Sequence, residues 1–378
     1  MADNMFFSRD TNFVVEIGSN RWAIPVLDGF SFSQATNTSE VTLNEMADTS
    51  GNSRRGRKLF TDSYAPAEWS FSTYARPFKS AGSAATDAND TANVHHAVEE
   101  VLWAMMAGDA AYASHDFTGF TRNSTTDVDI AFTSSNKVSL GTANFYFQLG
   151  GDGEIATVYK ITGCVVNEAS VDFDIDGIAT ISWSGFGGMI SEVAAFPAAT
   201  VTEGQLHTDT SNFIRNRLTQ LAISTADDHL LAAGESADGD SDAETYSVTL
   251  TGGNVTISNN ISFLIPETLG VVNQPLGHVT GTRSVSGNFT CYLNNATDGS
   301  MDLFERIIED TDTITNKFDL TFKIGGTSAP RMQLAMPACH LEVPTHSMDD
   351  IISLETNFHA LGTDIQSADE ISIKYVGA

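Results

Sequence analysis

The segment Phe147-Gln-Leu-Gly-Gly151 returns in altered form as Phe322-Lys-Ile-Gly-Gly326, at a sequence offset of 175 (322 minus 147). Two further pairs of segments share this offset: Gly163-Cys-Val165 with Ala338-Cys-His340, and Trp183-Ser-Gly-Phe-Gly187 with Phe358-His-Ala-Leu-Gly362. A chain that contains itself twice is typical of a structural building block, because duplicated units give pseudo-symmetric assemblies.

Earlier segments match at a different offset, as expected when loops differ in length. Glu68-Trp-Ser-Phe-Ser-Thr-Tyr-Ala-Arg76 aligns with Ser286-Gly-Asn-Phe-Thr-Cys-Tyr-Leu-Asn294, at an offset of 218 (286 minus 68). A short helix is predicted after each, over 98–106 before Gly108 and over 301–308, because apolar residues recur there at helical spacing. Each half therefore runs strand, helix, strand, hairpin.

Length and composition bound the class of protein. The 378 residues allow two domains, each large enough for a core of its own. No apolar run approaches the roughly 20 residues of a membrane span, and the first ten residues do not read as a signal peptide. The three cysteines, Cys164, Cys291 and Cys339, cannot form a disulfide framework, so we expect buried apolar fillers.

The net charge is the second strong signal. The chain has 48 acidic against 19 basic residues, a formal charge of −29. Such a surface repels nucleic acid. It suits either a saline environment or a function in which a polyanion must not stick, and the two explanations are compatible.

Strand patterns dominate, so the fold class is mainly β. The segments 170–175 and 178–183 alternate with period two around Asp176-Gly177, which predicts a hairpin with a type I′ turn. In the second half Asp349-Asp350 is the better turn. Further strands are predicted at 13–17, 143–149, 213–224, 246–250, 254–258, 261–265, 318–324, 333–335, 354–358 and 371–375.

Three segments without strand patterns organise the chain. A connector at 197–204 separates a first domain, 1–200, from a second, 201–378, and the second contains an acidic loop at 226–244. A long loop is predicted at 44–67, with four of the 19 basic residues inside five positions: Arg54, Arg55, Arg57 and Lys58. This cluster is either a solvated loop or a group that docks on the acidic face of a neighbouring subunit, with nucleic-acid contact a minor alternative.

This order of elements resembles the tail tube proteins of long-tailed bacterial viruses. The resemblance rests on Gly29-Phe-Ser-Phe32, the loop after Leu43, the strand 69–76, the helix 98–106 and the segment 159–188, with 260–292 as the counterpart in the second half. It covers most of the chain but depends on pattern and order, not on an invariant motif.

The resemblance implies a fold and an assembly. Each domain would be a β-sandwich or small barrel with a short flanking helix, and six domains would form a ring whose inner sheets join into one barrel. Three copies of a duplicated chain would supply the six, giving a homotrimeric, pseudo-hexameric ring. Rings would stack into the tube of the virion, made in the host cytoplasm. By analogy the partners are the tape measure and tail-end proteins, no cofactor is expected, and DNA passes through without specific binding.

The resemblance also suggests site residues. An acidic lumen lets DNA pass because phosphates meet like charge, and the candidate acids are Asp172, Asp174, Asp319, Glu342, Asp349 and Glu355. Any of them could instead face the outer surface or a subunit seam. For stacking, Glu40 and Glu45 are candidates to pair with Arg54, Arg55, Arg57 or Lys58 of the next ring.

Catalytic constellations are not evident in the sequence. There is no GxSxG, HExxH, Walker-type loop or CxxC. His95-His96 has no partner at ligand spacing, so we expect ordinary surface histidines. Asp172-Phe-Asp-Ile-Asp-Gly177 begins like a calcium loop, but Trp183 stands where a bidentate Glu is needed. A sugar-cleaving enzyme would need a pair of catalytic carboxylates, and no such pair stands out in the sequence. The remaining alternative is another β-rich virion part: a capsid decoration, baseplate protein or adhesin.

Overall fold

The computed structural model describes most of the chain. The described residues are 6–27, 29–41, 49–50, 58–79, 94–108, 112–113, 116–117, 119–123, 126–132, 140–150, 156–200, 210–225, 245–265, 275–309, 318–348, 350–363 and 367–377. Within them the protein is mainly β, with two short α-helices.

The elements follow one another in this order: η1 (Ser8–Asp10), β1 (Thr11–Ile17), β2 (Asn20–Ala23), β3 (Ser31–Val41), β4 (Lys58–Tyr74), β5 (Pro77–Lys79), β6 (His95–Ala97), α1 (Glu100–Ala107), β7 (Tyr112–Ala113), β8 (Asp116–Phe117), β9 (Phe120–Asn123), β10 (Asp127–Ala131), β11 (Ala143–Leu149), β12 (Thr157–Phe173), β13 (Thr180–Gly187), β14 (Ile190–Val193), η2 (Thr210–Asn212), η3 (Asn216–Leu218), β15 (Gln220–Thr225), β16 (Thr245–Ser247), β17 (Thr249–Ser258), β18 (Ser262–Leu264), β19 (Gly277–Val279), β20 (Ser284–Tyr292), α3 (Ser300–Glu309), β21 (Phe318–Ile324), β22 (Arg331–Leu341), β23 (Thr345–Met348), β24 (Ile352–Ala360) and β25 (Ser372–Val376).

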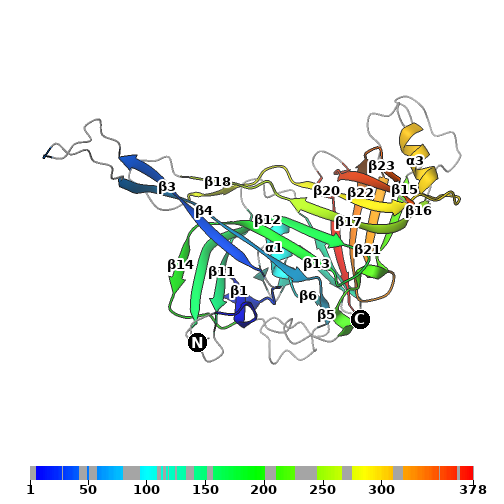
Figure 1. Cartoon of the computed structure of the whole chain (residues 1–378). Coiled ribbons are helices and arrows are strands. Elements are labelled where there is room, and N and C mark those ends of the chain that lie inside the picture. Colours follow the sequence, from blue (N-terminus) through cyan, green and yellow to red (C-terminus); the bar gives the residue numbers. More distant parts are fainter. Residues whose placement is uncertain are drawn as a thin grey trace.

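Two ladders of antiparallel strands repeat the same pairing order. The first ladder is β2-β1-β11-β12-β13-β4-β3. The second ladder is β16-β15-β21-β22-β24-β20-β17. In each, an α-helix follows the strand at the sixth place in the order, α1 after β4 and α3 after β20. Figure 1 shows the first ladder on one side of the molecule and the second on the other.

The register of the two ladders coincides at the predicted offset. Ala143 pairs with Cys164 and Phe318 with Cys339, and in both pairs of strands the register then shifts before the next paired residue. Both positions of the second pair follow those of the first at the offset of 175 (318 minus 143, and 339 minus 164). Both thiols point at a backbone carbonyl three positions earlier, and all three cysteines are buried. The prediction of buried cysteines is confirmed.

One of the three sequence matches is displaced by two positions. Val165 pairs with Phe186, whereas His340, which follows Val165 at the offset of 175 (340 minus 165), pairs with His359. The offset from Phe186 to His359 is 173 (359 minus 186), so the alignment of Trp183 with Phe358 is wrong. A slip of two positions leaves every side chain on the same face of a strand, and the alternating pattern therefore fits both alignments.

The corrected alignment exposes an exchange of aromatic and glycine residues. Trp69 lies opposite Gly185 in the first ladder, and Gly287 lies opposite Phe358 at the equivalent place in the second. A Cβ on Gly185 would come within 2.5 Å of the Trp69 ring, and one on Gly287 within 2.7 Å of the Phe358 ring. Each strand pair thus fills the core with one ring, supplied from opposite strands.

Two seams join distant strands into one sheet network: the first joins the two ladders, and the second joins the β9–β10 pair to the second ladder. β12 pairs with β17, from Glu168 opposite Ser258 to Phe173 opposite Gly253. The last strand, β25, lies between β22 and β10. Neither seam was predicted, because both join segments that are far apart in the sequence. They connect nineteen strands by hydrogen bonds.

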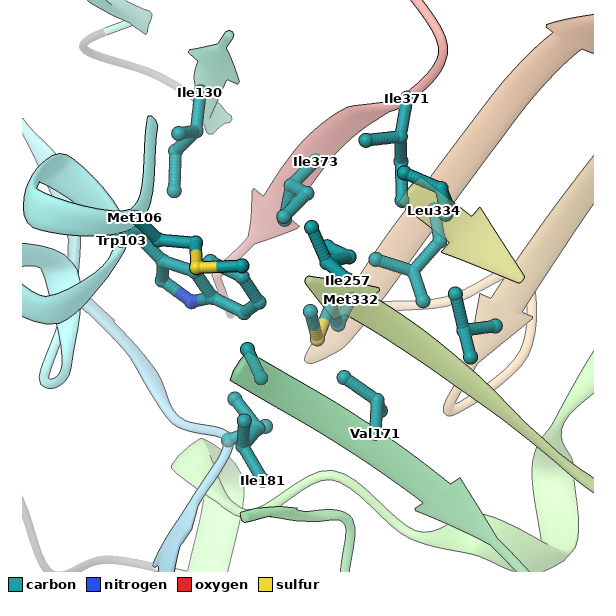
Figure 2. Close-up of a cluster of buried hydrophobic side chains, with 14 of the residues drawn as sticks. Trp103, Met106, Ile130, Val171, Ile181, Ile257, Met332, Leu334, Ile371 and Ile373 are labelled. Atoms are coloured by element: carbon teal, nitrogen blue, oxygen red, sulfur yellow. The ribbon is translucent and has the colours of Figure 1, made fainter. Parts of the chain in front are cut away.

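A continuous core lies between the sheets. Figure 2 shows Trp103, Met106 and Ile130 of the first half in the same cluster as Ile257, Met332 and Ile373 of the second. Helix α1 is buried along its whole length and ends at Gly108, as predicted, which has the left-handed conformation favoured at a helix end. Among the described side chains of helix α3, only Ser300, Leu303 and Ile307 are buried. The main cluster is therefore shared by the two halves of the chain.

Two local predictions also need correction. Residues 174–179 connect β12 to β13, so the Asp176-Gly177 pair is part of a longer connection instead of a tight turn of two, with Ile178 bridged to Arg215. The loop predicted at 44–67 ends earlier, because residues 58–67 belong to β4. The acidic loop at 226–244 lies outside the described residues.

Candidate functional site

One face of the joined sheet is polar across both ladders. Cross-strand neighbours on β4, β13, β12, β17, β20 and β24 form three rows: Ser70, Ser184, Glu168, Ser258 and Ser284; Ser72, Ser182, Ser170, Thr256, Ser286 and His359; Tyr74, Thr180, Asp172, Asn254, Asn288 and Asn357. We call these rows, together with Ser31, Ser33, Glu68, Thr290, Glu342 and Glu355, the polar face.

The polar face is the outer half of a period-two pattern. Its residues alternate with buried apolar ones such as Phe71, Ile181, Val171 and Ile257, which point into the core. Successive side chains of a strand point to opposite faces, so the core on one side fixes the polar residues on the other. The rows cross the β12–β17 seam without interruption, where Ser170 Oγ and Thr256 Oγ1 are 3.1 Å apart.

The charges of the polar face have one sign. It carries five carboxylates, from Glu68, Glu168, Asp172, Glu342 and Glu355, and none of its residues is Lys or Arg. Two of the carboxylates are held by neighbouring side chains. Asn357 Nδ2 donates to Glu342 at 2.9 Å and His359 Nε2 lies 3.3 Å from the same carboxylate, and these hydrogen bonds lower the pKa of Glu342. Asn288 Nδ2 donates to Glu355 at 3.2 Å.

The structure brings together only part of the predicted acids. Asp172, Glu342 and Glu355 lie on the polar face. Asp174 lies beyond the end of β12, in the connection to β13, and Asp319 lies on β21 opposite Ser224 of β15. Asp349 lies outside the described residues.

Sequence reasoning missed two acids of the polar face. Glu168 has the same parity as Asp172 on β12, and Glu68 has the same parity as Ser70 on β4. The parity of Glu68 was available from the segment 68–76, and that of Glu168 by extending the predicted strand 170–175 by two positions toward the N-terminus. The cross-strand rows that unite these residues with the second ladder were not.

The β3–β4 hairpin projects away from the rest of the molecule (Figure 1). Its outer part pairs Glu40 with Leu59 and Val41 with Lys58, so both predicted stacking residues in the described range lie far out on the hairpin. Leu59 and Phe60 are 59% and 54% exposed there. Arg54, Arg55, Arg57 and Glu45 lie outside the described residues. Large apolar side chains so exposed mark a surface that another molecule covers.

The histidine pair is structural, and its predicted surface position is wrong. His95 and His96 are buried on β6. His96 Nδ1 lies 3.1 Å from the Glu100 carboxylate, and Arg122 donates to that carboxylate at 2.9 Å and to Asp116 at 2.7 Å. Burial alone would raise the pKa of Glu100, but Arg122 and His96 outweigh it and hold it at about 2. The cluster is a buried ion-pair network beside α1.

A search for metal-binding groups finds no set of three His, Cys, Asp or Glu in the described part of the chain. In the segment that resembles a calcium loop, Asp176 instead lies 3.2 Å from Arg217. Among the described helices, none is long and apolar enough to span a membrane.

Comparison with known proteins agrees with the geometry. The family model described as "Phage tail tube protein" matches residues 13–360, nearly the whole chain. The tail tube protein pb6 of Escherichia phage T5 is 29% identical over 359 residues, which cover 93% of this chain and 70% of that protein. The chain therefore belongs to the phage tail tube proteins, a family of non-enzymatic structural components of the virion tail.

Proposed function

We propose that three copies of the chain form a ring, that rings stack into the tail tube, and that the polar face lines the bore through which DNA passes. The observation that carries the proposal is the polar face itself. It runs unbroken over both ladders and bears carboxylates and hydroxyls but no Lys or Arg side chain.

The trimer follows from the repeated ladders. Their shared pairing order and the common offset of 175 at the cysteine pairs support two tail-tube units, 1–200 and 201–378, in one chain. The main core is shared by the units, so a chain behaves as one rigid double unit. Three such chains supply six units, and cyclic closure of identical contacts makes a ring.

An acidic, hydroxyl-rich bore suits DNA passage. Phosphates repel carboxylates, and the absence of Lys and Arg from the polar face removes the side chains that bind phosphate by counterion release. Serine and threonine hydroxyls keep the surface wetted without adding charge. The bore then guides the polyanion and does not hold it.

Stacking is assigned to the β3–β4 hairpin. Arg54, Arg55 and Arg57, which lie between β3 and β4 in the sequence, join Lys58 in pairing with Glu40 and Glu45 of the next ring, and this contact covers Leu59 and Phe60. The basic residues and the acidic residues that receive them would face opposite ends of the ring, so the stacking contact is head-to-tail and can repeat along the tube. Tape measure and tail-end proteins are the partners inside and at the end of the tube.

Negative-stain electron microscopy of the purified chain at raised concentration tests the assembly. Expected end-on averages show an open bore, three chains and six lobes, in stacked rings. Compact monomers, or closed rings that never stack, would contradict it.

A second experiment tests the bore. The variant Ser182→Cys places a thiol on the middle row of the polar face. In long tubes this thiol is expected to react with a small maleimide but hardly with a maleimide attached to a large polymer. In the unassembled chain it is expected to react with both reagents. Arg217→Cys, whose exposed site is off the polar face, is the matched control. Equal reaction of Ser182→Cys with both reagents in tubes would place the polar face outside.

A further inference from the structure

We propose that neighbouring chains of the ring are joined by antiparallel pairing of β3 of one chain with β23 of the next, in the register that sets Ser33 opposite Thr345. The inference rests on the proposed ring. It adds the two edges and their register, derived from a seam that each chain already contains.

The internal seam is the template. Within one chain β12 of the first ladder pairs with β17 of the second, with Asp172 opposite Asn254 and Ser170 opposite Thr256. A ring built from alternating first and second units needs an equivalent seam between chains, from the second unit of one chain to the first unit of the next. Pseudo-symmetry predicts that it uses the counterparts of the same strands.

In the second ladder, β23 is the counterpart of the part of β12 that pairs with β17. The pairing of β12 with β13 shifts register between Val166 and Glu168, and β24 likewise pairs first with β22, up to Leu341, and then with β23 in a shifted register. Ser182 pairs with Ser170, and Glu355, at the offset of 173 from Ser182 (355 minus 182), pairs with Thr345. Thr345 therefore corresponds to Ser170, at the offset of 175 that also relates the cysteines.

The counterpart of β17 is β3. Both are the last strands of their ladders, paired with β4 and β20. Phe32 pairs with Trp69, and Val255 pairs with Gly287, the counterpart of Trp69. The offset is thus 223 (255 minus 32), which makes Ser33 the counterpart of Thr256. Carrying the pair Ser170–Thr256 to the new seam gives Thr345–Ser33.

Both edges are available for such pairing. In the described part of the chain β3 pairs with β4 alone, and β23 with β24 alone. Beside β23 the apolar side chains Val343 and Met348 are 63% and 74% exposed. An uncovered strand edge with exposed apolar side chains is a template for another chain.

The chemistry at the new seam matches the internal one. The hydroxyls of Ser170 and Thr256 are 3.1 Å apart on the polar face, and the proposed pair again brings together two hydroxyl residues, Thr345 and Ser33. In the same register His346 lies opposite Phe32, on the inner side where Val171 lies opposite Val255. The polar face then continues from chain to chain.

Cysteine cross-linking of assembled tubes tests the register. Directly opposed residues have Cβ atoms roughly 4.5–5.5 Å apart and diagonal ones roughly 7–8 Å, and a disulfide needs about 3.5–4.5 Å. Tubes of the chain with Ser33→Cys and Thr345→Cys are oxidised, and the products are separated by denaturing gel electrophoresis without reductant. The matched control, Ser31→Cys with Thr345→Cys, displaces one partner by two positions on the same face. The native cysteines are buried, so they add little background.

The expected main product of the first variant is a covalent ring of three chains, with mostly monomer from the control and from each single variant. Tubes in which the control links and the first variant does not would overturn the register. If neither variant forms cross-links in tubes, the pairing of these edges is overturned, unless amide exchange of the native protein supports it. In that second measurement we expect the amides of Thr345 and His346 to become protected on assembly. Unchanged exchange at these amides also overturns the pairing. Absence of any ring in the native protein would instead sink the proposed function, and the inference with it.

Discussion

Replacing Glu99 by Gln should change how the stability of the chain depends on pH. The Glu99 carboxyl is fully buried, one position before α1, and accepts a hydrogen bond from the Tyr375 hydroxyl of β25. That hydroxyl in turn accepts one from Trp103 Nε1 at 2.8 Å. Burial raises the pKa of Glu99 from 4.5 to about 7, although Tyr375 and the nearby Arg76 oppose the rise. The network ties the helix of the first half to the last strand of the second.

The size and sign of the effect follow from linkage. The folded-state pKa is the higher one, so the folded chain binds the proton more tightly than the unfolded chain does. This contribution to stability is complete below pH 4.5 and is lost as the pH rises through 7. The distance between the two pKa values corresponds to about 3 kcal/mol. Gln keeps an acceptor for Tyr375 but has no proton to lose.

The assay is urea unfolding of the unassembled chain at several pH values between 4 and 8.5. The free energy of unfolding of the native chain, minus that of Glu99→Gln, should fall by about 3 kcal/mol across this range. Glu305→Gln makes the same chemical change on the exposed side of α3 and sets the baseline. If the curves of the native chain and Glu99→Gln run parallel, the burial argument is refuted.

Four other changes have defined outcomes. Arg122→Leu leaves the buried Glu100 carboxylate without its main partner and should lower the free energy of unfolding in urea by about 3–5 kcal/mol. Gly185→Ala puts a Cβ within 2.1 Å of the Val165 carbonyl oxygen and 2.5 Å of the Trp69 ring, so calorimetry should show a loss of about 1–3 kcal/mol. Reversing Arg54, Arg55 and Arg57 to Glu should shorten tubes in electron micrographs while the unfolding of the free chain stays as it was. Asp172→Lys with Glu355→Lys should leave folding and assembly intact, because both side chains are exposed, but the tubes should then retain DNA on sedimentation at low salt.

Matched controls make these outcomes decisive. Arg217→Leu removes an ion pair whose side chains are 74% and 83% exposed, and it should change stability by less than about 0.5 kcal/mol. Ser184→Ala, next to Gly185 on the outer face, should be similarly mild. Tubes of normal length after the three arginine reversals would contradict the stacking role, as would a fall in length of the same size after Arg217→Glu. DNA retention that does not differ from the native tubes would contradict the placement of Asp172 and Glu355 in the bore.

The local features of the fold could be predicted from the sequence. The cysteine match, the end of α1 at Gly108 and the alternation that exposes Asp172 between Val171 and Phe173 each depend on neighbouring residues, and the structure has all three. The match of Trp183 with Phe358 failed because a period of two cannot distinguish alignments that differ by two positions.

The missed features depend on partners that are distant in the sequence. Nothing near Glu168 or Ser258 signals that β12 and β17 pair. His96 is buried beside Glu100, which pairs with it, and Glu100 is held in turn by Arg122, which comes from another strand. Residues 58–66 read as loop because, on the projecting hairpin, neither face of β4 is buried against the core before Ala67, and the apolar alternation disappears.

The exchange of Trp69 and Gly185 for Gly287 and Phe358 restricts how the two halves can evolve. A hybrid that combined β4 with a copy of β24 would place two large rings in the space of one. The reverse hybrid, β20 with a copy of β13, would set glycine against glycine and leave a cavity. Recombination between the two halves of the gene would therefore yield defective chains, which keeps the halves distinct and their order along the chain fixed.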